Sequence, residues 1–224
     1  KEAIASCNLT AAVDAVEGAG GRIVPMLLES LGVKCLPLYC DMTGNFPHTP
    51  EPTPANLVEL GELVAGSDAD IGFAVDPDVD RLVLVEGSGK LLSEEMTLAV
   101  AVDFLLGKQL GNVVVNLSTT GLIEEVAGKH NSTVKRSPVG EINVVEVMQE
   151  CDAVIGGEGN GGIIYPELHY GRDSLVGVAL FLSHLVEQKT TVSGLRASYP
   201  SYYLSKQKIA LTPQIDVDAI LEKM

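Results

Sequence analysis

Basic residues are scarce in this chain. Fifteen lysines and arginines stand against 30 aspartates and glutamates, which gives a formal net charge of −15 at pH 7. No run or stripe of Lys and Arg occurs along the sequence. Nucleic acids and anionic membranes attract proteins through such basic clusters. We therefore expect no nucleic acid and no membrane among the partners of this chain, and the charge of any phosphorylated ligand has to be met locally.

Cysteines are also few, and long apolar runs are missing. None of the four cysteines is spaced from another like the paired ligands of a zinc site. Cys35 and Cys40 flank the apolar stretch Leu36–Tyr39 and are predicted to be buried thiols, not a disulfide, which is typical of a reducing cytoplasm. No stretch is long enough to span a membrane, and no secretory signal is present. The sequence thus predicts a cytoplasmic globular protein.

Patterns of strands and helices alternate along the 224 residues. The runs that predict strands fall on either side of a turn at Glu86–Lys90: Thr10–Val16, Val33–Tyr39, Ile71–Val75 and Leu82–Val85 before it, and Val113–Leu117, Thr133–Arg136, Ala153–Ile155 and Ile163–Tyr165 after it. Helical patterns fill the intervals, at 22–31, 54–64, 93–106, 122–129, 141–150 and 174–188. We predict two similar tandem α/β domains, each with a mixed, mostly parallel sheet flanked by helices, divided near residue 90.

Some helix predictions concern single residues. The buried face of the first helix is predicted to consist of Ile23, Met26, Leu27 and Leu31. Thr53 is predicted to cap the second helix, with Pro54 at its first position. Asp173 is predicted to be the N-cap of the last long helix.

The two ends of the sequence favour a piece of a longer protein. The chain begins at Lys1, not at Met, and Asp216–Met224 has a helical pattern without a stop signal. The preceding segment, Ser201–Leu211, is predicted to be an extended exit strand.

Three aspartates alternate directly after the apolar strand Ile71–Val75. Asp76, Asp78 and Asp80 occupy positions i, i+2 and i+4, which an extended or turning backbone can bring to one centre. Carboxylates this close repel each other unless a cation neutralises them, and an all-oxygen ligand set favours a hard ion, Mg²⁺ or Ca²⁺. Arg81 follows as a donor to a phosphate group. The position at the carboxyl end of a strand favours a magnesium site for phosphoryl transfer.

Three other interpretations of this acidic loop have to be compared. An EF-hand calcium loop needs Gly at its sixth position and Glu at its twelfth, where this sequence has Arg81 and Gly87, so that interpretation fails. A phosphatase with an aspartyl nucleophile would attack with Asp76 and use Asp78 as the acid. The acidic pair that such a phosphatase needs on a later strand is replaced here by Gly156–Glu158. A solvated acidic turn without a ligand is the third interpretation.

A second candidate loop is rich in glycine. The segment Gly156–Gly162 contains five glycines around Glu158 and Asn160. Glycines let the backbone approach a ligand closely, and a carboxylate and an amide two residues apart can bind neighbouring hydroxyls of a sugar. A flexible surface turn is the alternative. The run Gly18–Gly21 is predicted to be a tight turn and not a dinucleotide-binding loop, because Ile23 occupies the place of the third glycine.

Three further loop side chains are candidates for contacts with a ligand. Arg136 ends a predicted strand and could contact a phosphate, or could be a plain surface arginine. His48 and His169 lie in loops, where a solvent-facing histidine is favoured over a donor to a substrate.

Four motifs occur in a fixed order along nearly the whole chain. They are Gly-Asn-Phe-Pro-His at Gly44–His48, Glu-Pro-Thr-Pro at Glu51–Pro54, Asp-Pro-Asp-Val-Asp-Arg at Asp76–Arg81 and Gly-Glu-Gly-Asn-Gly-Gly at Gly157–Gly162. This set resembles the α-D-phosphohexomutases, the family of phosphoglucomutase, phosphomannomutase and phosphoglucosamine mutase, whose members have four domains around a cleft. The resemblance implies that residues 1–88 form domain II with the metal loop and residues 89–200 form domain III with the sugar loop. Residues 201–224 would be the exit strand and the start of the linker to a missing domain IV.

The resemblance also implies roles for single residues. The ligands of Mg²⁺ would be Asp76, Asp78 and Asp80. The substrate would be bound by Glu158, Asn160 and Arg136. Arg81 would act in catalysis by steadying the phosphoryl group, and a phosphoserine of the missing domain I would complete the site. The whole enzyme would move a phosphoryl group between O1 and O6 of a hexose phosphate through a hexose 1,6-bisphosphate.

The sequence departs from the family's usual motifs at several positions. Pro77 replaces a glycine in the metal loop, and Asn160 and Gly162 replace a serine and a histidine in the sugar loop. No segment like the family's nucleophilic serine loop occurs, so the chain alone is predicted to be inactive. Two alternatives are an aspartyl phosphatase that uses Asp76 and a non-catalytic module that binds a metal ion or a sugar phosphate.

Overall fold

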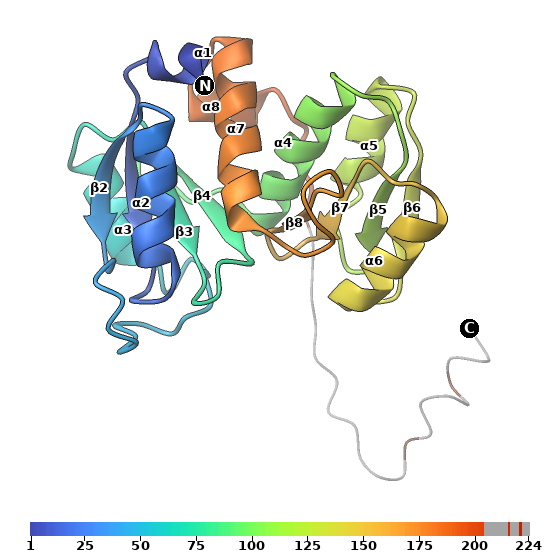
Figure 1. The fold of residues 1–224 in the computed structure, drawn as a ribbon, viewed down its shortest axis with the longest axis horizontal. Coiled ribbons are helices and arrows are strands. Elements are labelled where there is room, and N and C mark those ends of the chain that lie inside the picture. Colours follow the sequence, from blue (N-terminus) through green and yellow to red (C-terminus); the bar gives the residue numbers. More distant parts are fainter. Residues whose placement is uncertain (204–214, 216–219, 221–224) are drawn as a thin grey trace.

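The two groups of apolar runs fold into two four-stranded sheets (Figure 1). The computed structural model describes residues 1–203 together with Ile215 and Ile220. The first sheet has the order β2-β1-β3-β4 and consists of β1 (Thr10–Asp14), β2 (Lys34–Leu38), β3 (Ile71–Val75) and β4 (Leu82–Glu86). The second has the order β6-β5-β7-β8 and consists of β5 (Val113–Asn116), β6 (Val134–Ser137), β7 (Ile155–Glu158) and β8 (Gly162–Ile164).

Strand directions repeat from one sheet to the other. In each order the first three strands are parallel and the last is antiparallel to its neighbour. The predicted fold class, two α/β units with mixed, mostly parallel sheets, is confirmed. The carboxyl ends of the parallel strands meet at one edge of each sheet, which is where α/β proteins bind ligands.

Helices cover both faces of each sheet. They are α1 (Glu2–Ala5), α2 (Gly20–Ser30), α3 (Val58–Ala65), α4 (Glu94–Leu106), α5 (Leu122–Lys129), α6 (Glu141–Glu150), α7 (Ser174–Gln188) and α8 (Val192–Ala197). Successive residues of a strand point to opposite faces, so Ala11 and Val13 of β1 share a core with Val24 of α2, whereas Ala12 packs with Leu60 of α3. The second sheet repeats this arrangement with α5 on one face and α6 on the other.

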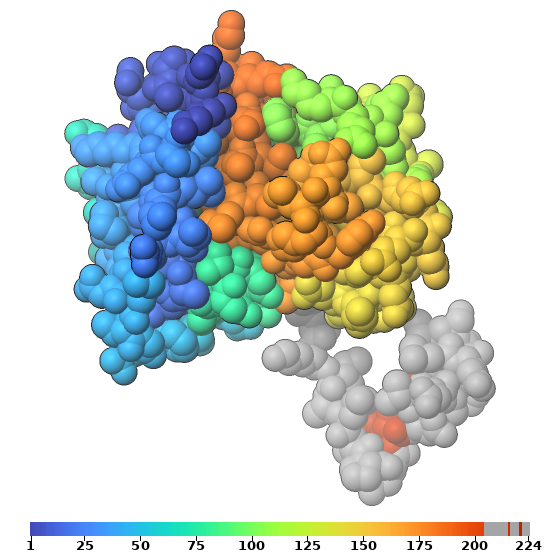
Figure 2. Space-filling model, in the orientation of Figure 1, coloured from blue at the N-terminus to red at the C-terminus, as the bar shows by residue number. Residues whose placement is uncertain are grey.

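Helices α4 and α7 lie between the two sheets (Figure 1), and in Figure 2 the orange surface that includes α7 separates the blue first half of the chain from the yellow second half. Ten of the 13 residues of α4 are buried, as expected for a helix that is apolar on nearly all sides. Phe181 of α7 packs edge-to-face on Phe73 of β3, with ring centroids 6.4 Å apart. The predicted division at residues 88–89 falls in the connection between β4 and α4, and one apolar core continues across it.

The structure corrects the predicted buried face of α2. Ile23 and Met26 are 41% and 48% exposed, and the other two members of the predicted face are partly buried. The buried stripe is instead Gly20, Val24 and Leu28, at spacing i, i+4, i+8. A Cβ at Gly20 would lie 2.6 Å from a side chain of β3. The glycine therefore allows the first turn to lie directly on the sheet, which rotates Ile23 and Met26 toward solvent.

One predicted helix cap is confirmed and one is wrong. The Oδ1 of Asp173 accepts hydrogen bonds from the N–H groups of Leu175 at 2.7 Å and Val176 at 3.2 Å, so it caps α7 as predicted. Thr53 does not cap α3, because residues 54–56 form a separate turn and the helix begins at Val58.

Strand β7 extends into the glycine run that the sequence predicts to be a loop. It spans Ile155–Glu158, not Ala153–Ile155. A Cβ at Gly157 would lie 2.2 Å from the carbonyl oxygen of Gly162 in β8. The first glycines of the run therefore allow two strands to approach closely, and only the turn that follows them is a loop.

The cysteines of the structure are free thiols. Cys35 and Cys40 are half-buried, and burial raises their pKa values to about 11 and about 12. Thiols with such pKa values are protonated and unreactive at neutral pH.

Two predictions lie outside the described residues. Of the predicted exit strand Ser201–Leu211, the structure describes only residues 201–203. Of the predicted helix Asp216–Met224, it describes only Ile220. Among the helices that the structure describes, none combines the length and the apolarity needed to cross a bilayer.

Candidate functional site

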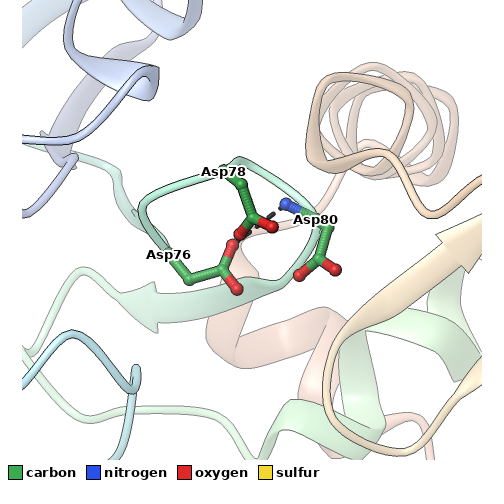
Figure 3. Close-up of side chains that lie close together, drawn as sticks. All are labelled: Asp76, Asp78 and Asp80. Atoms are coloured by element: carbon green, nitrogen blue, oxygen red, sulfur yellow. Dashed lines mark hydrogen bonds between the residues drawn. The ribbon is translucent and has the colours of Figure 1, made fainter.

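The acidic loop connects the carboxyl end of β3 to β4 (Figure 3). Asp76, Asp78 and Asp80 turn their carboxylates toward the inside of this loop, and one oxygen from each lies within 4.8 Å of the others. Asp76 is buried, Asp80 is half-buried and Asp78 is exposed. The three residues that the sequence singles out as metal ligands therefore lie together.

Asp76 determines the course of the loop. Its Oδ1 accepts hydrogen bonds from the backbone N–H groups of Asp80 at 2.9 Å and Arg81 at 3.0 Å. Its own carbonyl accepts one from the N–H of Val79 at 3.1 Å. A carboxylate that accepts several backbone N–H groups replaces the ladder that a strand would provide, so the chain can turn sharply here.

The loop contains a strained residue that its neighbours hold in place. Val79 has a φ of +66°, which is rare for a β-branched side chain. The N–H of Ser174, at the start of α7, donates to the carbonyl of Val79 at 3.0 Å. On the other side, the N–H of Ala19 donates to the carbonyl of Pro77 at 2.9 Å. Segments far apart in the sequence thus fix the loop, as strain of this kind requires.

The charges of the triad are close together, and those of Asp76 and Asp80 are partly or fully shielded from solvent. Burial, followed by the adjacent Asp76 carboxylate, raises the pKa of Asp80 to about 6, and the positive charges of Arg172 and Arg81 oppose this rise. The Oδ1 of Asp80 is buried and has no hydrogen-bond partner in the part of the chain that the structure describes. A donor set of carboxylate oxygens that includes one free of hydrogen bonds from the described residues fits a hard divalent cation such as Mg²⁺.

Arg81 lies beside the triad. Its Nε is 3.5 Å from Oδ2 of Asp76 and 3.7 Å from Oδ1 of Asp80. One Nη is 3.9 Å from Glu51, and 32% of the side chain is exposed. The guanidinium is therefore next to the carboxylates and still open to a ligand from solvent.

Asp76 is poorly placed as a nucleophile, because it is buried and, in the described part of the chain, only its Oδ2 is free of backbone hydrogen bonds. Only 6% of the residue is exposed, and its Oδ1 already accepts two backbone hydrogen bonds. A nucleophilic carboxylate needs a free lone pair directed at the substrate. The geometry of this loop thus gives no support to an aspartyl phosphatase.

The predicted sugar-binding residues lie on the hairpin from β7 to β8. Glu158 is 5% exposed; its Oε1 accepts a hydrogen bond from Nδ2 of Asn116 at 2.7 Å, and its Oε2 accepts one from Arg172 at 2.9 Å. The Oδ1 of Asn160 accepts the N–H of Gly162 at 3.1 Å and so shapes the turn. The glycine-rich segment is a largely buried hairpin and does not lie at the surface.

Arg172 connects this hairpin to the acidic loop, a role that the sequence did not predict. It bonds to Glu158 through one Nη and to Asp80 through the other. Its side chain is only 13% exposed. Two features of the sequence could have pointed to it. Arg172 is one of only 15 basic residues, and it directly precedes Asp173, whose role as N-cap fixes the backbone at this point.

Arg136 lies in a different environment. Its Nε and one Nη bond to Glu124 at 2.8 and 2.9 Å, and the other Nη bonds to the carbonyls of Asn116 at 3.1 Å and Thr119 at 2.8 Å. These bonds hold the loop that follows β5. None of the contacts of the described residues joins Arg136 to the acidic loop, and its role in binding a phosphate stays a prediction.

The two candidate histidines have carboxylate partners. His48 is half-buried, and its Nε2 is 3.1 Å from Oδ2 of Asp14, whose pKa is raised by burial. It is therefore less open to solvent than the sequence predicts. The side chain of His169 is 50% exposed, with Nε2 3.0 Å from Asp173, as a solvent-facing loop histidine would be.

Each half of the chain matches a domain model of a known protein family. Residues 1–89 match the family model described as phosphoglucomutase/phosphomannomutase, alpha/beta/alpha domain II, and residues 93–202 match the model described as domain III. The chain belongs to the phosphoglucomutase/phosphomannomutase family. The phosphoglucomutase/phosphomannomutase of Thermococcus kodakarensis is 33% identical over 209 residues, which cover 92% of this chain and 46% of the relative. The chain thus spans about half the length of the curated relatives it matches.

Solved structures of this family share the fold. A phosphoglucomutase/phosphomannomutase family protein from Burkholderia thailandensis is 27% identical, with a TM-score of 0.80 over 89% of this chain and 45% of that one. The N-acetylphosphoglucosamine mutase of Aspergillus fumigatus, solved in complex with GlcNAc-6P and magnesium, has a TM-score of 0.61 at 16% identity, over 86% of this chain and 46% of that one. The second likeness establishes the fold alone.

Proposed function

We propose that the chain forms domains II and III of a phosphohexomutase, which transfers a phosphoryl group between O1 and O6 of a hexose phosphate. The observation that carries the proposal is the convergence of Asp76, Asp78 and Asp80 at the end of β3, in a chain that belongs to this family. Residues 1–88 would be domain II and residues 89–200 domain III. Domains I and IV would belong to the same polypeptide, and the coverage of about half of each relative supports this.

The three aspartates would hold Mg²⁺. The magnesium found in the Aspergillus fumigatus relative supports this choice of ion. When bound, Mg²⁺ would offset the negative charge on the phosphoryl group in transfer. Asp76 would keep the loop in shape through its two backbone hydrogen bonds, and Arg81 would direct its partly exposed guanidinium at the phosphoryl oxygens.

The hairpin from β7 to β8 would bind the sugar. Glu158 would accept hydrogen bonds from its hydroxyls, and Asn160 would donate to them or accept from them. Arg136 would have to exchange one of its present bonds to reach a phosphate. A phosphoserine on domain I would donate the phosphoryl group to the hexose phosphate, so that a hexose 1,6-bisphosphate forms; this intermediate would then return its other phosphoryl group to the same serine. Without that serine, the chain by itself is expected to turn over no substrate.

Calorimetric titration of the purified chain with Mg²⁺ tests the metal site. We expect binding that Asp78→Asn weakens at least tenfold, since a charged ligand oxygen contributes on the order of 1.4 kcal/mol or more. Asp78 is exposed, so the variant should keep the stability of the parent chain. Asp68→Asn, at another exposed aspartate of the same half, is the matched control and should bind Mg²⁺ unchanged. Equal affinities for all three proteins would contradict the assignment.

Activity requires the remaining domains. In a chimera, this chain would replace the matching segment of the Thermococcus kodakarensis relative, and conversion of glucose 1-phosphate to glucose 6-phosphate would be measured. We expect turnover in the chimera, none with Asp78→Asn in it, and none with the chain alone. A folded chimera that binds Mg²⁺ and converts no hexose phosphate would refute the proposed activity. Binding of a hexose phosphate to the chain alone, as tight as to the intact relative, would favour a binding module.

A further inference from the structure

Arg172 joins parts of the site that come from both sheets. Its guanidinium donates to three carboxylates: Asp80 in the loop after β3, Glu158 of β7 at 2.9 Å and Glu141 at the start of α6 at 3.2 Å. Its backbone N–H also donates to Glu141, at 3.0 Å. The planar fork of an arginine fixes each carboxylate that it bonds in direction as well as distance. One side chain therefore sets the relative positions of the acidic loop and the sugar hairpin.

The hairpin from β7 to β8 leaves room for this side chain. A Cβ at Gly162 would lie 2.3 Å from Cδ and 3.0 Å from Cγ of Arg172. The arginine stem cannot move aside while its fork is bonded at three points. Arg172 can therefore occupy this position only because residue 162 is a glycine. Any larger residue at position 162 would displace the arginine side chain.

Arg172 also decides how Asp80 faces the rest of the triad. It bonds Oδ2 of Asp80, while the buried Oδ1 has no hydrogen-bond partner among the residues the structure describes. A carboxylate held at one oxygen cannot rotate freely, so its second oxygen keeps a fixed direction. Partners that orient ligand side chains in this way raise metal affinity, typically by 10- to 100-fold.

We propose that Arg172 is a positioning residue that fixes Asp80 for the cation and Glu158 for the sugar, so that one side chain sets both halves of the site. The inference rests on the proposed function, since it takes the triad to bind a cation. It adds a residue that touches neither the cation nor the sugar and acts through the carboxylates. If Arg172 acts by positioning, its removal weakens the binding of the cation. If its positive charge acts mainly by repelling the cation, its removal strengthens that binding.

Substitution of Arg172 separates the two effects. Arg172→Lys keeps the charge but lacks the fork, and Arg172→Met removes the charge and keeps an apolar stem. We expect the Kd for Mn²⁺, measured by calorimetry, to rise about tenfold in both variants. Arg22→Lys, at an exposed arginine on α2, is the matched control and should leave the Kd unchanged. Parent-like affinity in Arg172→Lys, or tighter binding in Arg172→Met, would overturn the proposal.

Gly162→Ala provides a second route that changes no charge. Its methyl group should displace Arg172 and raise the Kd for Mn²⁺ by a similar factor, with little further rise when it is combined with Arg172→Lys. Thermal unfolding of each variant accompanies the titrations: a purely structural residue would lower Tm and leave the Kd of the folded protein unchanged, which would count against positioning. If the parent chain binds Mn²⁺ and the folded variants bind it equally well, only this inference fails. If the parent chain binds no cation, the proposed metal site fails with it.

Discussion

Replacing Asp76 by asparagine and by alanine separates its part in shaping the acidic loop from its charge. In the structure, Oδ1 of Asp76 accepts the N–H groups of Asp80 and Arg81 at 2.9 and 3.0 Å. Asparagine has a carbonyl oxygen at the same place and can accept both. Alanine leaves both N–H groups without an acceptor in a half-buried loop. The two variants should therefore differ in stability but share the loss of a ligand charge.

The magnitudes follow from the number of bonds. A hydrogen bond to a charged group contributes about 1.5 kcal/mol or more, so Asp76→Ala should lower the free energy of unfolding by about 3 kcal/mol. Asp76→Asn keeps both bonds in their weaker, neutral form and relieves the repulsion between Asp76 and Asp80. These effects offset each other, and we expect the stability of Asp76→Asn to stay within about 1 kcal/mol of the parent.

Urea unfolding and Mg²⁺ calorimetry test both statements. Asp76→Asn should unfold at nearly the parent midpoint but bind Mg²⁺ at least tenfold more weakly. Asp76→Ala should show a clearly lower midpoint as well as weak binding. Equal destabilisation by the two substitutions would refute the role of Oδ1 as the acceptor that shapes the loop. Parent-like Mg²⁺ affinity in Asp76→Asn would refute its charge as a ligand.

Three further predictions use other parts of the molecule. Gly161→Ala should lower the free energy of unfolding by about 2–3 kcal/mol in urea titrations, because Gly161 has a φ of +90° and a Cβ there would lie 2.4 Å from the carbonyl oxygen of Leu82. Gly128→Ala should instead raise the free energy of unfolding by about 0.5–1 kcal/mol, because alanine is favoured over glycine within a helix and a Cβ at this position of α5 meets no atom within 4 Å. A loss of stability would contradict this prediction. Asp103→Asn should cost about 2 kcal/mol at pH 7. Burial alone would raise the pKa of Asp103, but His184, whose Nε2 lies 3.6 Å from Oδ2, and the hydrogen bonds from His130 and Tyr199 outweigh it and hold the pKa well below the usual 3.8. Because the folded pKa is depressed, this stabilisation is complete above about pH 4 and is lost as the pH falls further, so the difference from the parent should shrink toward pH 2. A difference that does not change with pH would contradict it.

The sequence predicted well what depends on neighbouring residues. The three aspartates lie within five positions after a buried strand, so the local backbone alone brings them together. The same holds for Asp173, which caps the helix that follows it directly. Strand β3 was predicted with its observed bounds because turn residues enclose a short apolar run on both sides.

What the sequence could not predict depends on contacts between distant segments. The bond from Arg172 to Asp80 joins residues 92 positions apart and requires both sheets to be in place. The buried face of α2 was missed for a related reason. A hydrophobic pattern gives no weight to glycine, yet Gly20 is the residue that packs on the sheet, and only the neighbouring strand reveals it. In β7, glycines that indicate a loop in the sequence are required by the closeness of β8.

These long-range contacts also bear on how the two halves can move. The acidic loop belongs to the first sheet, but the N–H of Ser174 holds Val79, the carbonyl of Gly161 accepts the N–H of Leu82, and Arg172 holds Asp80. All three partners come from the second half of the chain. A hinge between the sheets would break these bonds and separate the faces that α4 and α7 bury together. We therefore expect the two units to move as one body.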